Sequence, residues 1–265
     1  PDWCEVAAGP FLLGSKPDDE DANSDEQPQR TVNLPAFRIA RYPVTNAQWQ
    51  FFIDAQGYRE QQWWSAAGWA LIQAQGWMAP RLWDDPRFNG ANQPVVGITW
   101  YEATAYCRWL SNQLGYAGYA VRLPSEAEWE KVARGSAGLI YPWGKSWDKS
   151  KANIGPRSYA TTTPVGCYPD GASPCGALDM SGNVFEWTAT PWTDDYRNSN
   201  ETGIEQRGRE PGGAEQEGDA EEYVRRGGAW GHHLRFARCA YRYGIRPSSY
   251  SHFVGVRVVA ALMQD

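Results

Sequence analysis

The sequence predicts an α+β fold in a single domain, and three observations lead to that prediction. Three segments carry helix-capping residues followed by an apolar stripe, which is typical of amphipathic helices. Short apolar runs bounded by turn residues elsewhere indicate short strands. The 265 residues are 42% hydrophobic and include 27 Gly, 18 Pro and 15 Trp, which suits one sizeable core with many turns. We therefore expect one domain over residues 1–265, with much irregular structure.

Each of the three predicted helices has a polar capping residue at its start and a glycine at its end. In the second and third, a glutamate three residues after the cap completes a capping box. Apolar residues then recur at helical spacing, as Trp49, Phe52 and Ile53 do in the first helix. The segments run from Thr45 to Gly57, from Thr99 to Gly115 and from Ser125 to Gly135.

Short strands are expected in much of the remaining sequence. The candidates are the segments 37–42, 163–166, 184–189, 224–230 and 254–262. Segment 17–29 is acidic and polar, and segment 194–222 is rich in Gly, Glu, Gln and Asn with almost no apolar residues, so both are predicted to be loops. We interpret 194–222 as a mobile, solvated insertion rather than a functional lid.

Charge and composition limit the possible partners and compartments. A formal net charge of −6 excludes a dominant electrostatic attraction to nucleic acid. The chain has no apolar run of the roughly twenty residues that span a membrane, and no signal segment as given. We expect a soluble protein of the cytoplasm or cell surface. Of five cysteines only Cys167 and Cys175 are close in sequence, where a local disulfide and buried reduced thiols both remain open.

Seven motifs, read in order along the chain, carry a resemblance to a known family. They are RYPVTNAQW, GITWYEATAYCRWL, VRLPSEAEWEKVARG, YPWG, ALDMSGNVFEWT, YVRRGGAW and FVGVRVV. In this order they resemble the formylglycine-generating enzyme, or sulfatase-modifying-factor, family, and the match spans about Phe11 to Ala260. The resemblance implies the C-type lectin fold of that family: small twisted antiparallel sheets with flanking helices and much irregular structure.

The resemblance also bears on catalysis. Family enzymes oxidise a substrate cysteine with molecular oxygen, using copper held by two cysteines that follow a GG[SA][WY] motif. That motif is present here at residues 227–230, but the two cysteine positions fall at or near His232 and at Leu234. Copper(I) prefers thiolate ligands, and leucine cannot bind a metal. We therefore expect no catalytic residues, no copper or iron, and a protein that is not an enzyme.

Two further expectations follow from the same resemblance. The family's structural half-cystine positions hold Cys107 and Cys239 without their partners, so both thiols are expected to be buried and reduced. A family calcium site in the ALDMSGNVFEWT motif corresponds to Asp179, Gly182, Val184 and Glu186. Two carboxylates suit this hard cation. The alternative is that the aspartate caps a turn and the glutamate accepts a hydrogen bond inside the fold.

The C-terminal stretch 231–258 has an unusual composition. It lacks Trp, Gln, Lys, Glu and Met, although these types supply about a fifth of the chain. Mutation of the first two bases of an asparagine AAC codon cannot produce any of these five. That mutation is the output of diversity-generating retroelements, whose variable proteins this chain resembles. In them a C-type lectin fold carries the diversified segment between GG[SA]W and a terminal GxR strand.

Within this stretch, framework residues alternate with candidate variable positions. The framework set is Arg238, Ala240, Arg242, Pro247, Gly255 and Arg257. The candidate ligand-binding set mixes aromatic, small and imidazole side chains, as a paratope does. It comprises Gly231, His232, His233, Leu234, Phe236, Tyr243, Gly244, Ile245, Ser249, Tyr250, Ser251, His252 and Phe253.

The expected function is that of a non-catalytic, monomeric ligand-binding protein with a diversified surface. Its expected partner is a protein or another macromolecular surface. Two alternatives remain open. A divergent metal-dependent oxidase or sulfoxide synthase would bring the three histidines, His232, His233 and His252, together in a pocket. A catalytically dead partner subunit would show an apolar patch outside residues 227–258.

Overall fold

The computed structural model describes residues 1–115, 118–155, 160–196 and 220–262, so the predicted insertion 194–222 lies mostly outside the described residues. Within those ranges the protein forms two four-stranded sheets, a two-stranded hairpin and four α-helices. The α+β prediction is therefore confirmed. None of the helices in the described ranges has the length and apolar character needed to cross a membrane.

The capping residues identified in the sequence begin three of these helices. Thr45, Thr99 and Ser125 each accept a hydrogen bond from the backbone N–H three residues on, and each belongs to a complete capping box. Gly115 ends the second predicted helix in the left-handed conformation, which glycine adopts without strain. The helices are α1 (Asn46–Asp54), α2 (Ala66–Gln75), α3 (Trp100–Leu114) and α4 (Glu126–Arg134).

The first sheet joins both ends of the protein in the order β1-β4-β10-β5, with antiparallel pairing throughout. Its strands are β1 (Trp3–Val6), β4 (Phe37–Ala40), β5 (Tyr119–Arg122) and β10 (Val259–Leu262). A separate antiparallel hairpin pairs β2 (Gly9–Leu13) with β3 (Arg30–Leu34). The C-terminal strand is therefore held in the centre of a sheet.

The second sheet has the order β8-β7-β6-β9 and contains one parallel pair, β6 with β9. Its strands are β6 (Phe185–Pro191), β7 (Tyr223–Arg226), β8 (Arg242–Ile245) and β9 (Val254–Val256). The predicted strand 254–262 is thus two strands that belong to different sheets. The break falls at Arg257, whose buried side chain turns inward to bond Glu186.

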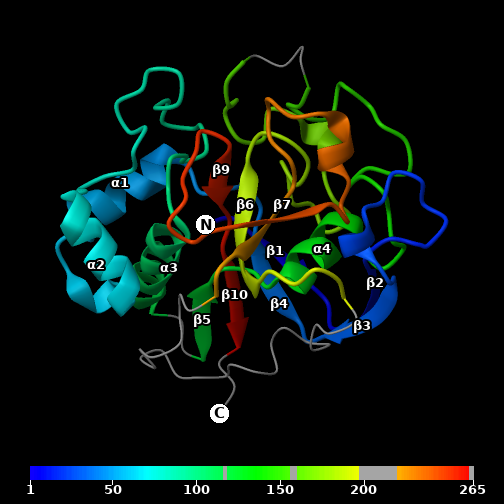
Figure 1. Cartoon of the computed structure of the whole chain (residues 1–265), viewed down its shortest axis with the longest axis horizontal. Coiled ribbons are helices and arrows are strands. Elements are labelled where there is room, and N and C mark those ends of the chain that lie inside the picture. The colour runs from blue at the N-terminus through cyan, green and yellow to red at the C-terminus, as the bar shows by residue number, and fades with distance from the viewer. Residues whose placement is uncertain (116–117, 156–159, 197–219, 263–265) are drawn as a thin grey trace.

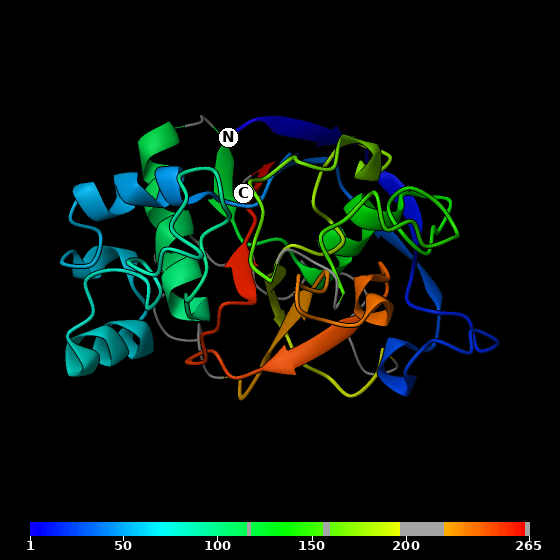
Figure 2. The ribbon, with the colours of Figure 1, turned by 90° about the horizontal axis from the view of Figure 1, so that it is seen from above.

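The two sheets form the middle of the molecule, with α1, α2 and α3 at one end and α4 with the β2–β3 hairpin at the other (Figures 1 and 2). Buried side chains divide accordingly. One apolar cluster packs α1 and α3 against β6 and β9, and a second packs α4 against the hairpin and the first sheet. Trp129 on α4 is fully buried in the second cluster.

Several sequence expectations differ from this structure. Segment 163–166 is not a strand, and the strand predicted at 224–230 ends at Arg226, before the two glycines. Helix α2 and strands β1, β2, β3, β5 and β8 were not predicted. The strands have only four or five residues, too few for a clear alternation. The apolar residues of α2 lie on all sides of the helix, so no stripe marks it.

Candidate ligand-binding surface

The C-terminal stretch leaves β7 through a tight glycine turn. Gly227 and Gly228 have φ values of 100° and 70°, which favour glycine. A Cβ at Gly228 would lie 2.8 Å from the carbonyl oxygen of Phe236, so a larger residue would clash with the backbone. The backbone then forms the short 3-10 helix η4 (Leu234–Ala237), strand β8 and an irregular loop that leads to β9.

Buried arginine–carboxylate pairs hold this stretch against the rest of the fold. Arg238 donates to both oxygens of Glu26 at 2.7 and 2.6 Å. Arg242 does the same to Glu126 at 2.7 and 2.9 Å. Arg257 donates to Glu186 on β6, at 2.8 Å from its nearest nitrogen. Removal of one partner of such a pair costs about 3–5 kcal/mol, so these residues fix the backbone path.

Burial separates the two predicted sets of residues completely. All six framework residues, from Arg238 to Arg257, are buried. All thirteen candidate ligand-binding residues are exposed or partly exposed. Among the large apolar side chains of this set, Leu234, Tyr243 and Tyr250 are exposed, with 37%, 47% and 47% of their surface accessible. We call the thirteen positions the C-terminal surface.

Aromatic and imidazole rings form the middle of the C-terminal surface. The Phe253 ring lies 4.5 Å from His232 and 4.0 Å from His252, measured between ring centroids. Trp230, from the glycine motif, packs beneath at 5.0 Å from Phe253. Phe88 stacks on His252 at 5.7 Å and extends the cluster to a segment distant in sequence. The surface therefore has a stiff aromatic centre.

Both imidazoles in this cluster have a lowered pKa. Burial, followed by the positive charge of Arg225, lowers the pKa of His232 to about 4. Burial and then Arg87 also lower the pKa of His252. His233 is exposed and turns away, because its Nδ1 accepts a hydrogen bond from the backbone N–H of Arg235 at the start of η4. His232 and His233 both lie in the turn before η4.

The three histidines do not form a metal-binding group in the part of the chain that the structure describes. No set of three or more His, Cys, Asp or Glu side chains there is arranged to hold a metal ion. The partner-subunit alternative called for an apolar patch elsewhere. The exposed large apolar side chains outside the C-terminal surface, among the described residues, lie on four separate segments: Phe51, Met78, Ile140 and Leu262.

Segments distant in sequence also border the surface and were not predicted. Trp77, which follows α2, makes an edge contact with Tyr250 at 5.6 Å between ring centroids. The guanidinium of Arg81 lies 3.8 Å from the Trp77 ring. On the other side Arg225, on β7, lies 4.8 Å from the ring of Tyr243. The high density of tryptophan between residues 63 and 83 was the sequence signal that could have indicated the first of these contacts.

None of the five cysteines forms a disulfide. Cys107 and Cys239 are buried as expected, and burial raises the pKa of Cys239 to about 12. Cys167 is exposed and Cys175 partly exposed, so neither the local disulfide nor a pair of buried thiols is present.

Three of the residues expected to bind calcium, Asp179, Gly182 and Val184, lie at a strained turn before β6, and the fourth, Glu186, lies on β6. Asp179 is almost fully buried and has a φ of 58°, a conformation that costs energy in a non-glycine residue. Burial raises the pKa of its carboxyl to about 6, and the neighbouring Glu186 contributes in the same direction. The Glu186 carboxylate accepts hydrogen bonds from Trp129 and Arg257. Asp179 accepts a hydrogen bond from the backbone N–H of Gly166 at 2.7 Å.

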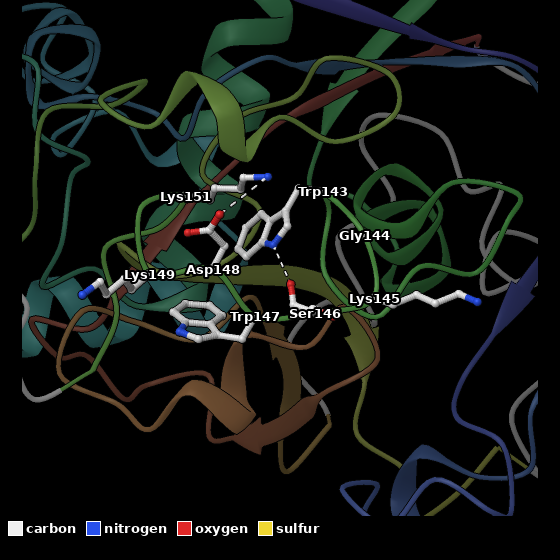
Figure 3. A pocket seen from close by; sticks show the side chains of 8 residues that line it. All are labelled: Trp143, Gly144, Lys145, Ser146, Trp147, Asp148, Lys149 and Lys151. Atoms are coloured by element: carbon white, nitrogen blue, oxygen red, sulfur yellow. Dashed lines mark hydrogen bonds and ion pairs between the residues drawn. The ribbon is translucent and has the colours of Figure 1, made fainter.

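An open pocket of about 650 Å³ lies on the loop 143–151 (Figure 3). Trp143 and Trp147 line it, with their ring centroids 5.7 Å apart. Lys151 points toward Asp148, at 3.8 Å between nitrogen and oxygen (Figure 3). Lys145 and Lys149 extend away from the two indole rings. The lining residues include none of the thirteen predicted positions.

The fold and the site together define a C-type-lectin-like domain whose C-terminal surface is held in place by buried framework residues. Residues 1–262 match the family model of the sulfatase-modifying factor enzyme 1-like domain. The chain therefore belongs to the sulfatase-modifying-factor family, as its motifs indicated.

Three proteins show what this chain is similar to within and beyond that family. Hercynine oxygenase of Mycolicibacterium thermoresistibile is 39% identical over 94% of this chain and 56% of its own length. Formylglycine-generating enzyme of Thermomonospora curvata is 32% identical over 79% of this chain and 78% of its own. The structure of Treponema denticola variable protein 1 matches with a TM-score of 0.71 at 21% identity, covering 99% of this chain and 95% of that one, which shows the shared fold alone.

These relatives correct one expectation. The interpretation that the protein lies outside enzyme chemistry was drawn from the absence of two cysteines, which concerns a single copper mechanism. Relatives at 32–42% identity are named enzymes, and they include hercynine oxygenases as well as a formylglycine-generating enzyme. The chain therefore belongs to a family whose named members are enzymes, and the expectation that it is not an enzyme is wrong. The chain spans only about half the length of the hercynine oxygenases that it matches.

Proposed function

We propose that this protein binds a ligand through the C-terminal surface, and that the ligand is a protein or another macromolecular surface. The observation that carries the proposal is the separation by burial of thirteen accessible residues from six buried framework residues in one continuous stretch. Because side chains at accessible positions can change without repacking the core, such a stretch can alter its specificity and keep its fold. Its tyrosines and other rings supply contact area with few rotatable bonds.

We also propose that this surface is diversified by a retroelement. The missing residue types between 231 and 258 support it. A protein of the same fold carries the name variable protein.

The DNA around the gene tests this proposal. We expect a reverse transcriptase gene and a near-copy of the segment that encodes residues 231–258, differing from it only opposite adenines. Sequencing of independent isolates should then find substitutions among the thirteen surface codons and none at the six framework codons. If the near-copy is absent and the substitutions fall equally on both sets, the diversification proposal fails.

A second candidate function is an oxygenase activity, favoured by the 39% identity to hercynine oxygenase. The test is oxygen consumption by the full-length gene product, loaded with iron and supplied with hercynine and a thiol. Turnover above the metal-free control would support this candidate. A rate equal to that control, from a protein shown to bind iron, would refute it.

Calcium at the strained turn is a separate proposal. One oxygen of Asp179 accepts the hydrogen bond from Gly166, and its other oxygen, with the carbonyls of Gly182 and Val184 and the carboxylate of Glu186, would complete the family's ligand set. Burial and the nearby Glu186 carboxylate raise the pKa of Asp179, so a divalent cation at this turn would stabilise the charged form of Asp179. Bound calcium would thus act on stability rather than on the C-terminal surface.

A further inference from the structure

Arg225 lies at the C-terminal surface but is not one of the thirteen candidate variable positions. It precedes Arg226 on β7, and alternate residues of a strand face opposite sides of the sheet. Arg226 points into the core and pairs with Glu130. Arg225 points the other way, opposite Tyr243 in the register between β7 and β8. A constant arginine therefore stands beside side chains that we propose to vary.

The guanidinium of Arg225 is enclosed by aromatic rings and has no anionic partner among the described residues. Its Cζ lies 4.5 Å from the Phe185 ring centroid and 4.8 Å from that of Tyr243. Its Nε is buried with no acceptor, and no hydrogen bond or ion pair of its side chain occurs in the described ranges. Burial lowers its pKa to about 10. Partial desolvation of a cation without a partner is costly, so an incoming anion would recover stabilisation.

Four buried arginines of this region contrast with Arg225. Arg226, Arg238, Arg242 and Arg257 each bond a buried carboxylate. Arg225 alone among these five lacks one in the part of the protein that the structure describes. The fold thus supplies carboxylates to its structural arginines and leaves this one open at the surface.

A second unpartnered polar atom lies beside it. The Nδ1 of His232 is buried without a hydrogen-bond partner among the described residues, and the His232 ring contacts Phe185 at 5.1 Å between centroids. Both side chains therefore share the Phe185 ring as a neighbour. Because a planar guanidinium can bind both oxygens of a carboxylate, the fitting group on the ligand is a carboxylate.

We propose that Arg225 is the constant anion-binding residue of the C-terminal surface, where it takes a carboxylate of the ligand, such as an aspartate, a glutamate or the carboxyl terminus of a polypeptide. The proposal rests on the proposed binding function. In it, Arg225 supplies a common electrostatic contact, and the residues at positions such as 232 and 243 decide which carboxylate-bearing surface can approach it. A variable surface would then keep one contact through every change of specificity.

The test uses the whole protein labelled with nitrogen-15 in arginine, and follows the Nε–Hε signals by NMR. Phenylacetate is the probe, since it joins a carboxylate to one aromatic ring; benzylammonium is its cationic match, and inorganic phosphate is the tetrahedral anion. Sodium chloride keeps the ionic strength constant. We expect phenylacetate to shift the Arg225 signal saturably, with a half-maximal concentration of about 1–10 mM, a range typical of ligands of this size.

Benzylammonium should leave that signal unchanged, and phosphate should shift it less than phenylacetate does. In Arg225→Gln the affinity for phenylacetate, measured from the shifts of neighbouring backbone signals, should fall at least about tenfold. The matched control Arg246→Gln, at an exposed arginine of the same stretch, should behave as the wild type. A linear, unsaturating shift in the wild type, or equal shifts in Arg225→Gln, would overturn the proposal. Because the wild-type titration decides alone, misfolding of a variant cannot hide the result.

The two levels of proposal fail in different ways. Absence of carboxylate binding, in a protein whose thirteen positions vary among isolates, would overturn only the role of Arg225. Invariant surface codons with intact phenylacetate binding would leave an anion site and remove the variable surface.

Discussion

Replacement of Arg242 by methionine and, separately, of Tyr243 by alanine tests the separation between framework and surface at two adjacent residues of β8. Arg242 is buried and donates to both oxygens of Glu126, and also to the backbone carbonyls of Asp25 and Thr193. Tyr243 is 47% exposed, and its ring contacts the guanidinium of Arg225. Arg242 therefore belongs to the buried framework, and its neighbour Tyr243 belongs to the C-terminal surface.

The expected magnitudes differ several-fold. Burial alone would raise the pKa of Glu126, and Arg242 together with Arg226 holds that pKa below its usual value. Removal of Arg242 leaves the buried carboxylate with two weaker partners, Arg226 at 3.4 Å and the Tyr196 hydroxyl at 3.1 Å, at a cost of about 3–5 kcal/mol. In a protein of this size that lowers Tm by about 6–20 °C. Loss of the Tyr243 ring removes a partly exposed cation–π contact worth about 0.5–1 kcal/mol.

The assay is urea unfolding followed by circular dichroism and by tryptophan fluorescence, with thermal melts in parallel. Glu126→Gln serves as the matched control, because it removes the charge of the same pair from its other side. The reasoning is refuted if Tyr243→Ala destabilises the protein as much as Arg242→Met, or if Arg242→Met costs less than about 1 kcal/mol.

Three further outcomes are expected. Because the pKa of His232 falls from 6.5 to about 4, its contribution to stability should decline as the pH drops from about 6.5 toward 4, and His232→Asn should lack that part of the pH dependence in denaturant titrations. The pKa of the Asp179 carboxyl is raised from 3.8 to about 6, so its ionisation should reduce stability as the pH rises from 3.8 to 6. Calcium should raise Tm above pH 6. In melts with calcium and with a chelator, Asp179→Asn should abolish both the pH effect and the calcium effect. A thiol reagent should modify Cys167 fast in the native protein and the three buried cysteines only after unfolding, as peptide mapping of the labelled thiols would show.

Local sequence signals predicted the parts of this fold that depend on local physics. Helices α3 and α4 were identifiable because a capping box is complete within four residues. Helix α2 was not, since its apolar residues surround the helix and its stability comes from packing against α3. The division of 254–262 into two strands depends on the bonds of Arg257 to Glu186, a residue far away in sequence.

The same distinction applies to the candidate site. Framework and surface positions alternate within one stretch, so their pattern could be read from the sequence. Arg225, Trp77 and Phe88 reach the surface from three other elements, and only the fold brings them there. The absence of two cysteines did not justify the expectation that the protein is not an enzyme, because the loss of one metal site excludes one mechanism and not the chemistry of the whole family.

Two glycines limit how freely the C-terminal surface can vary. A Cβ at Gly231 would lie 2.6 Å from the ring of Phe253, which is itself a candidate variable position. A Cβ at Gly244 would lie 2.6 Å from the ring of Trp192, outside the variable stretch. Positions 231 and 253 should therefore depend on each other, whereas position 244 should favour glycine whatever its variable neighbours are.

A double-mutant cycle measures this dependence. Gly231→Ala alone should cost about 1–2 kcal/mol, because the Phe253 ring must leave its contacts with Trp230 and His252. In the Phe253→Ser background the same change should cost almost nothing, which gives a coupling energy above about 0.5 kcal/mol in urea unfolding. Gly244→Ala, as the comparison, should cost the same in both backgrounds. Additive costs at 231 and 253 would mean that each position varies independently, and that the accessible sequences of this surface are limited by the ligand and not by packing among the variable side chains.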